Sequence, residues 1–146
     1  MYLSEIGPAS TAYVPYLGRV WRMRHDRSVW GRPLTVKGET FARGLGLAPR
    51  TTLVYATDGR FERFEARVGI DDETRGKGKA ALTITTDGRQ AFNRTLAGGG
   101  KAVPVNIPLA GVKQVTILVD FGPDDDIGDH VDLGDARLIK VRRQRH

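Results

Sequence analysis

A short alternating stretch constrains the fold more than any other part of the sequence. From Arg63 to Ile70, apolar residues at every second position alternate with charged residues or glycine. A period of two places one face of a β-strand on a core and the other in water, and it does not fit a helix. The stretch therefore predicts a half-buried strand, for which the rest of the chain has to supply partners.

A turn precedes this strand, and a glycine-rich segment lies further upstream. Asp58-Gly59 is a common hairpin pair, because glycine accepts the positive φ that a tight turn needs. Gly44 and Gly46 indicate a bulge or a close approach of two backbones rather than a helix. We expect Phe41–Asp72 to fold as strand, glycine-rich corner, strand, hairpin turn and strand, and to end in an acidic loop.

The other expected strands are short and are separated by Gly, Pro or Asp-Gly. They are a hairpin over Leu34–Ala42, strands at Ala81–Thr86 and Gln90–Leu96 around the turn Asp87-Gly88, and strands at Val103–Leu109, Lys113–Phe121 and Ala136–Val141. Prolines place the Val103–Leu109 strand at a sheet edge, since proline donates no backbone hydrogen bond. The Lys113–Phe121 strand is apolar on both faces and is expected at a sheet centre. No segment has a helical period, so the sequence predicts one all-β domain over residues 1–146, a sandwich or barrel.

Length and composition exclude several classes of protein. The 146 residues contain no run of about 20 apolar residues that could span a bilayer, and Met1–Glu5 does not resemble a signal peptide. A signal of an exported parent protein would therefore lie outside this chain. Cysteine is absent, which excludes disulfides and thiolate chemistry.

The net charge of +6 comes partly from Arg142, Arg143 and Arg145 in the C-terminal tail, residues 141–146. A basic tail can bind polyanions, and a solvated terminus is the alternative interpretation. Elsewhere acidic and basic residues are interspersed, as in Arg60–Arg67, which is typical of a soluble surface. Nucleic acid is therefore not expected as a partner.

The densest polar segment is Asp124–Asp132, with Asp135 just beyond it. Calcium takes about six to eight oxygen ligands from carboxylates, carbonyls and water. The candidate calcium ligands are Asp124, Asp126, Asp129 and Asp135. The same segment can bind a sugar, because carboxylates accept hydrogen bonds from hydroxyls and histidine donates or accepts one more. A solvated acidic turn is the third interpretation.

Residues of two kinds are candidates for sugar binding. The polar candidates are Asp71, Asp72, Asp129, His130 and Asp132, and the aromatic ones are Trp21, Trp30 and Tyr16. The aromatic residues either form a stacking face for a sugar or cover one end of the core.

Catalysis is poorly supported. The sequence has no Gly-x-Ser-x-Gly, no P-loop and no His-Glu-x-x-His. Asp71 and Asp72 are adjacent, and adjacent strand residues point to opposite faces, so they are poorly placed to flank one glycosidic bond. Only His130 has acidic neighbours that could orient it, and a Ser-His-Asp arrangement stays open. We expect a domain that is not an enzyme.

Three segments, in this order and at this spacing, resemble the NPCBM family of carbohydrate-binding modules. They are Arg43–Gly46, Arg63–Asp72 and Asp129–Leu138, and the resemblance covers roughly Val36–Lys140. It implies a jelly-roll-like, galactose-binding-like β-sandwich that serves as an accessory domain of a larger protein. Some members bind galactose-containing glycans and carry a structural calcium ion. The matching positions are Gly44 and Gly46 at the corner, Asp71 and Asp72 in the acidic loop, and Asp129, His130, Asp132, Asp135 and Arg137 in the final motif.

Two positions depart from the family pattern. This chain has Leu47-Ala48-Pro49 where the family commonly has a histidine, and Leu133 where it commonly has a tryptophan. If those family side chains line the sugar site, this chain lacks a hydrogen-bonding imidazole and a stacking indole. If the tryptophan is a core residue, leucine is a smaller filler.

The resemblance implies a non-catalytic module that recognises glycans, galactose-containing ones among them, with calcium as a structural ion. Its parent protein would be extracellular, on the cell surface or periplasmic, and other domains of that protein would be partners. The alternative is a structural or protein-interaction sandwich that has lost the sugar site. A third hypothesis is binding of an anionic polysaccharide or nucleic acid through Arg142–Arg145.

Overall fold

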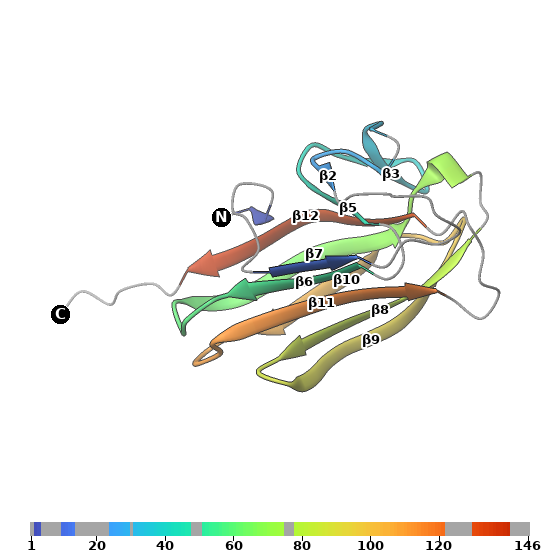
Figure 1. The fold of residues 1–146 in the computed structure, drawn as a ribbon. Helices are drawn as coiled ribbons and strands as arrows, with labels where there is room; N and C mark the ends of the chain where they lie inside the picture. The colour runs from blue at the N-terminus through green and yellow to red at the C-terminus, as the bar shows by residue number, and fades with distance from the viewer. Residues whose placement is uncertain are drawn as a thin grey trace.

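Two antiparallel β-sheets packed face to face make up this computed structural model, which describes residues 2–3, 10–13, 24–29, 31–47, 51–74, 78–121 and 130–140 (Figure 1). Sheet I has the order β1-β6-β11-β8-β9, with bounds Ser10–Tyr13, Thr51–Ala56, Gln114–Phe121, Lys79–Thr86 and Arg89–Ala97. Sheet II has the order β10-β7-β12-β5-β2, with bounds Val103–Pro108, Phe61–Ile70, Val131–Lys140, Gly44–Leu47 and Arg24–His25. The predicted all-β sandwich is confirmed.

The core lies between the inner faces of the two sheets. In β7, Phe64 and Val68 are fully buried while the intervening Arg67 faces outward, as the alternation predicts. The largest fully buried side chains of this core include Leu45, Leu47, Leu53, Tyr55, Phe64, Ile70, Leu82, Ile84, Leu109 and Ile117. Burial of these groups is the main favourable contribution to folding, about 1.5–3 kcal/mol for each large apolar side chain.

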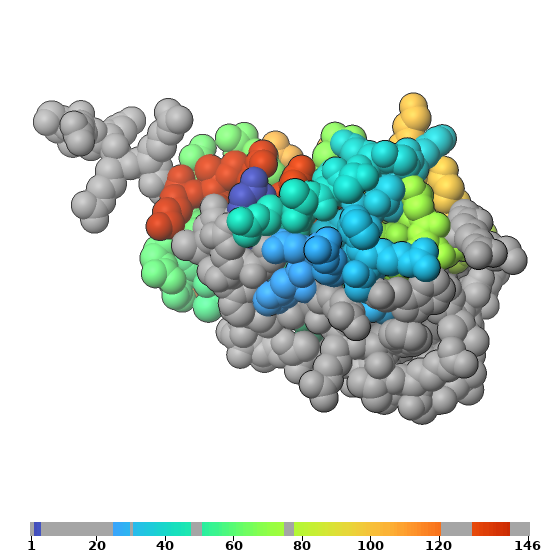
Figure 2. Space-filling view, turned by 90° about the horizontal axis from the view of Figure 1, so that it is seen from above, coloured from blue at the N-terminus to red at the C-terminus, as the bar shows by residue number. Residues whose placement is uncertain are grey.

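A two-stranded hairpin forms a second layer on the outer face of sheet II. It consists of β3 (Leu34–Val36) and β4 (Glu39–Phe41), joined by a turn at Lys37 and Gly38, which have φ values of 44° and 80°. Its apolar residues Leu34, Val36 and Phe41 form a separate cluster with Ala102, which precedes β10. The hairpin residues gather on the face seen from above in Figure 2.

The predicted strand positions within the sheets are confirmed at two places. β11 lies between β6 and β8 at the centre of sheet I, and β10, with Pro104 and Pro108, lies at the edge of sheet II. The last strand was expected at Ala136 but begins at Val131, where β12 pairs with β5 and β7. Its first residues therefore belong to the sheet and not to an acidic loop.

The prediction of a hairpin at Asp58-Gly59 is wrong, although the turn itself is present. Both residues have positive φ, 49° and 71°, but β6 belongs to sheet I and β7 to sheet II, so the turn crosses between the sheets. Its amides donate to the connection between β10 and β11, with Asp58 N–H 3.0 Å from the Lys113 carbonyl and Gly59 N–H 2.8 Å from the Val112 carbonyl. By contrast, Asp87-Gly88 does join the paired strands β8 and β9.

The close backbone approach expected at Gly44 and Gly46 is confirmed, but the segment is strand β5 and not a corner. A Cβ atom at Gly46 would lie 2.3 Å from the Arg27 carbonyl oxygen, and one at Gly44 would lie 2.3 Å from the Leu133 carbonyl oxygen. These neighbours are backbone atoms, which cannot move aside as a flexible side chain can. Only glycine fits at either position.

Gly46→Ala is expected to lower the free energy of unfolding by about 3 kcal/mol, because the added methyl overlaps backbone. Gly88→Ala is the matched control. At φ +82° with no atom within 4 Å, it meets only the cost of a left-handed conformation, about 1 kcal/mol. Urea denaturation of the variants measures both values, and equal losses would contradict the steric argument.

Candidate functional site

A cluster of buried polar side chains lies where the end of β7 and the start of β12 meet the β3–β4 hairpin. The short 3₁₀-helix η2 (Asp72–Thr74) follows β7 here, at the upper right of Figure 1. The Asp71 N–H donates to the His130 carbonyl at 2.8 Å, which ties the two strand ends together. Asp71, His130 and Asp132 are 2%, 2% and 0% exposed, so these three sugar-binding candidates point into the protein.

Asp71 and Asp132 form a carboxyl pair beneath the backbone of β3. The Thr35 N–H donates to Oδ2 of both residues, at 3.2 Å and 3.1 Å. Burial, followed by the hydrogen bond and the negative charge of Asp71, raises the pKa of Asp132 from 3.8 to about 11. The pair therefore holds a proton at neutral pH, because two bare carboxylates would repel each other in a dry interior.

A second contact group surrounds Glu73, whose side chain is 1% exposed. His130 Nδ1 lies 2.7 Å from Glu73 Oε2, and the Ser28 hydroxyl donates to Glu73 Oε1 at 2.5 Å. The same Ser28 oxygen accepts the Arg32 N–H at 3.0 Å. Ser28 is fully buried and gives its proton to the carboxylate and not to His130, so this trio orients loops and does not present a nucleophile.

Asp72 points to the hairpin and not into the cluster. Its two oxygens accept the Lys37 and Gly38 N–H groups at 2.8 Å and 2.9 Å. Because those amides belong to the β3–β4 turn, the carboxylate fixes the hairpin against η2. Asp71 and Asp72 thus attach the hairpin to the end of β7, and Glu73 holds the loop before the hairpin through Ser28 and the Arg32 amide.

Several candidates lie outside the described residues. These are Trp21, Trp30, Tyr16, Asp124, Asp126, Asp129 and the tail at 141–146. The two family departures that are described, Leu47 and Leu133, are both fully buried in the core. Each leucine is therefore a core residue in this chain.

Asp135 is the one calcium candidate that the structure describes. It has a φ of 52° at an irregularity in β12 and lines a groove of about 300 Å³ on the outer face of sheet II. Glu65, Arg67 and Arg137 line the same groove, where Arg137 is paired with Glu65 at 2.9 Å and Arg67 with Glu39 at 3.2 Å. Among the described residues, no group of three or more acids or histidines is arranged to hold a metal.

Sequence reasoning missed Ser28 and the Thr35 amide as members of the cluster, and it placed Glu73 in the acidic loop without making it a candidate site residue. Ser28 and Thr35 carry no local signal, because their partners are 45 and 97 residues away in the chain. Glu73 was visible within the acidic loop, but composition alone assigns such a residue to water.

The sandwich has the fold of CBM51 carbohydrate-binding modules of known structure. A CBM51 from Clostridium perfringens GH95, solved in complex with methyl-galactose, is 28% identical with a TM-score of 0.84, over 94% of this chain and 98% of that chain. The chain belongs to the NPCBM/NEW2 domain family, whose model matches residues 1–139. The family prediction is confirmed, and the match extends beyond the residues that suggested it.

Other relatives are much longer than this chain. The C. perfringens ZmpB structure that contains an M60 catalytic domain with two CBM51 domains is 25% identical, with a TM-score of 0.84, over 97% of this chain and 15% of that chain. A Renibacterium salmoninarum protein named as an endo-alpha-N-acetylgalactosaminidase is 32% identical over 110 residues, 75% of this chain. This chain spans 7% of that relative's length. No helix in the described part of the chain is long and apolar enough to cross a membrane.

Asp132→Asn tests the shared proton. The pKa of Asp132 is about 11 in the folded protein and near 3.8 in the unfolded chain. The protonated carboxyl therefore contributes its full stabilisation below pH 3.8, and this contribution is lost as the pH rises toward 11. From about pH 7 to about pH 9, the wild-type free energy of unfolding should fall by up to about 1.4 kcal/mol per pH unit. Asparagine is neutral throughout and can still donate to Asp71, so the variant should lose this slope.

The matched control is Asp58→Asn, which removes a carboxylate that is 64% exposed. Its pH dependence, measured by urea denaturation at each pH, should parallel the wild type. Parallel curves for all three proteins would show that Asp132 is ionised in the folded state and would contradict the pairing.

Proposed function

We propose that this chain is a non-catalytic module that binds glycans with terminal galactose and belongs to a larger exported protein. The observation that supports this best is the match to the methyl-galactose complex, which covers nearly the whole of both chains. Relatives in which such modules accompany a catalytic domain support the accessory role.

The buried cluster supports the proposal by holding the chain next to residues that can contact a sugar. Ser28 and His130 are fixed through Glu73, and in the sequence Trp30 is two residues from Ser28 while Asp129 precedes His130. Polar groups that are this well buried and paired restrict the conformations of the segments they hold. We assign Trp30 to sugar stacking, Asp129 to a hydroxyl contact, and Asp71, His130 and Asp132 to positioning.

Calcium is proposed as a structural ion of the acidic segment. Carboxylates of Asp124, Asp126 and Asp129 provide the hard oxygen ligands that this ion prefers. Asp135 is the fourth candidate ligand, in a groove that it shares with Glu65 and two arginines. The ion would order the segment before β12 and leave recognition to the protein side chains.

A glycan array probed with the purified chain, in calcium and again in chelator, tests the proposal. Binding to galactose-terminated glycans is expected, and it should weaken in chelator if calcium orders the acidic segment. A blank array in both conditions would contradict glycan binding and favour the alternative, a structural or protein-interaction sandwich. The burial of Asp71, His130 and Asp132 is the observation that would then carry that alternative.

Trp30→Ala should reduce the affinity for a galactose-terminated glycan roughly tenfold, because stacking on an aromatic face contributes about 0.5–1.5 kcal/mol beyond its buried area. Isothermal titration calorimetry measures the change, and circular dichroism checks the fold. Trp21→Ala is the matched variant. If neither substitution weakens binding, the stacking role of both tryptophans is contradicted.

A further inference from the structure

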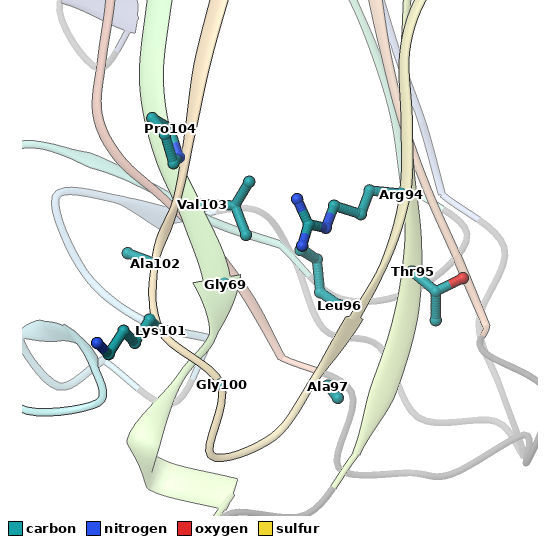
Figure 3. Close-up of a pocket in the computed structure, with 10 residues that line it drawn as sticks. All are labelled: Gly69, Arg94, Thr95, Leu96, Ala97, Gly100, Lys101, Ala102, Val103 and Pro104. Carbon is teal, nitrogen blue, oxygen red and sulfur yellow. The ribbon is translucent and has the colours of Figure 1, made fainter.

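A cavity lies on the flank of the sandwich, between the edge strands of the two sheets. β9 ends sheet I and β10 ends sheet II, and the space beside them has a volume of about 430 Å³ (Figure 3). Small-molecule sites typically measure about 300–1,000 Å³, so one or two sugar rings are a suitable occupant. The cavity is separate from the buried cluster of Asp71, Glu73 and Asp132, none of which lines it.

Arg94 interrupts the apolar inner face of β9. The facing pairs of β8 and β9 on this side are Ala80–Leu96, Leu82–Arg94 and Ile84–Phe92. Every other member of these pairs is buried or packs against the core. In Figure 3 the Arg94 side chain extends from β9 across the gap toward Val103 on β10. Arg94 is exposed to solvent, so the cation lies at the open rim of the core, at a position where the strand pattern would place an apolar residue.

No acid of the described chain neutralises this cation. Arg94 forms no ion pair or hydrogen bond with the described residues, and no Asp or Glu lines the cavity. Lys101 is a second lining residue, and its side chain points away from Arg94 in Figure 3. It adds positive potential without occupying the space in front of the guanidinium.

An inward charge on an edge strand has a known structural use, since it discourages pairing with another chain. That use needs no cavity. Here the guanidinium lies beside Leu96 and Val103, of which Leu96 is buried and Val103 packs against the core (Figure 3). A planar donor beside an apolar wall suits a ligand with a carboxylate and a body that has an apolar face.

We propose that this cavity binds an acidic sugar residue of a glycan, with its carboxylate on Arg94 and its ring on the apolar side chains of Leu96 and Val103. The proposal rests on the proposed glycan-binding function and adds a ligand class to it. Sugar hydroxyls would find partners in the free backbone groups that edge strands present.

Titration of the ¹⁵N-labelled chain with glucuronate, N-acetylneuraminate and neutral galactose tests the assignment by NMR. The two acids should shift the amide signals of Leu96, Ala102 and Val103, and galactose should not. Arg94→Gln should weaken acid binding about tenfold or more, since a charge-assisted contact is lost. Arg89→Gln, an exposed arginine on the same strand that does not line the cavity, should leave it unchanged.

Absence of shifts with both acids, or equal shifts with galactose, would overturn the proposal. If the wild type binds no acidic sugar and the Arg94→Gln variant self-associates, the role of Arg94 is instead to prevent the edge strand from pairing with another chain. If neutral glycans bind on the array while acidic sugars leave the cavity signals unmoved, only the cavity assignment fails. Acid binding at the cavity without any neutral glycan binding would contradict the galactose proposal and leave the cavity assignment standing.

Discussion

A single proton shared by Asp71 and Asp132 decides how the loops around the candidate site are held. With it, two buried carboxyl groups can lie beneath one backbone amide of β3; without it, two negative charges would share a site that excludes water. The hairpin, η2 and the start of β12 all meet at this pair. The acidic residues that resemble a ligand site in the sequence therefore serve mainly to attach the β3–β4 hairpin to sheet II.

Local chemistry in the sequence predicted the strands well and their partners less well. The period of two in β7, the prolines of β10 and the two-sided apolarity of β11 are properties of the segments themselves, and each prediction is confirmed. Asp58-Gly59 forms the turn that its φ preferences require, but the sheet that receives the next strand depends on competition among all strands. Turn residues specify a change of direction and not a pairing.

The sequence predicted which residues belong to the candidate site, but it did not predict that their side chains are buried. Asp71, His130 and Asp132 do come together, yet they do so in the interior, where each has a hydrogen-bond partner, although Asp132 Oδ1 has none among the described residues. At Arg94 the sequence reveals an unusual residue but not its surroundings. Its position between Phe92 and Leu96 is an irregularity that strand periodicity reveals, but the cavity beside it appears only when two edge strands from different sheets are placed together.

The order of strands has a consequence for synthesis. The middle strand of sheet I is β11 and that of sheet II is β12, and these are the last two strands that the described residues form. Each joins halves of a sheet that are otherwise not hydrogen-bonded to each other. A ribosome-bound chain that ends before β11 can form hairpins but neither sheet, so cooperative folding has to wait until almost the whole domain has emerged.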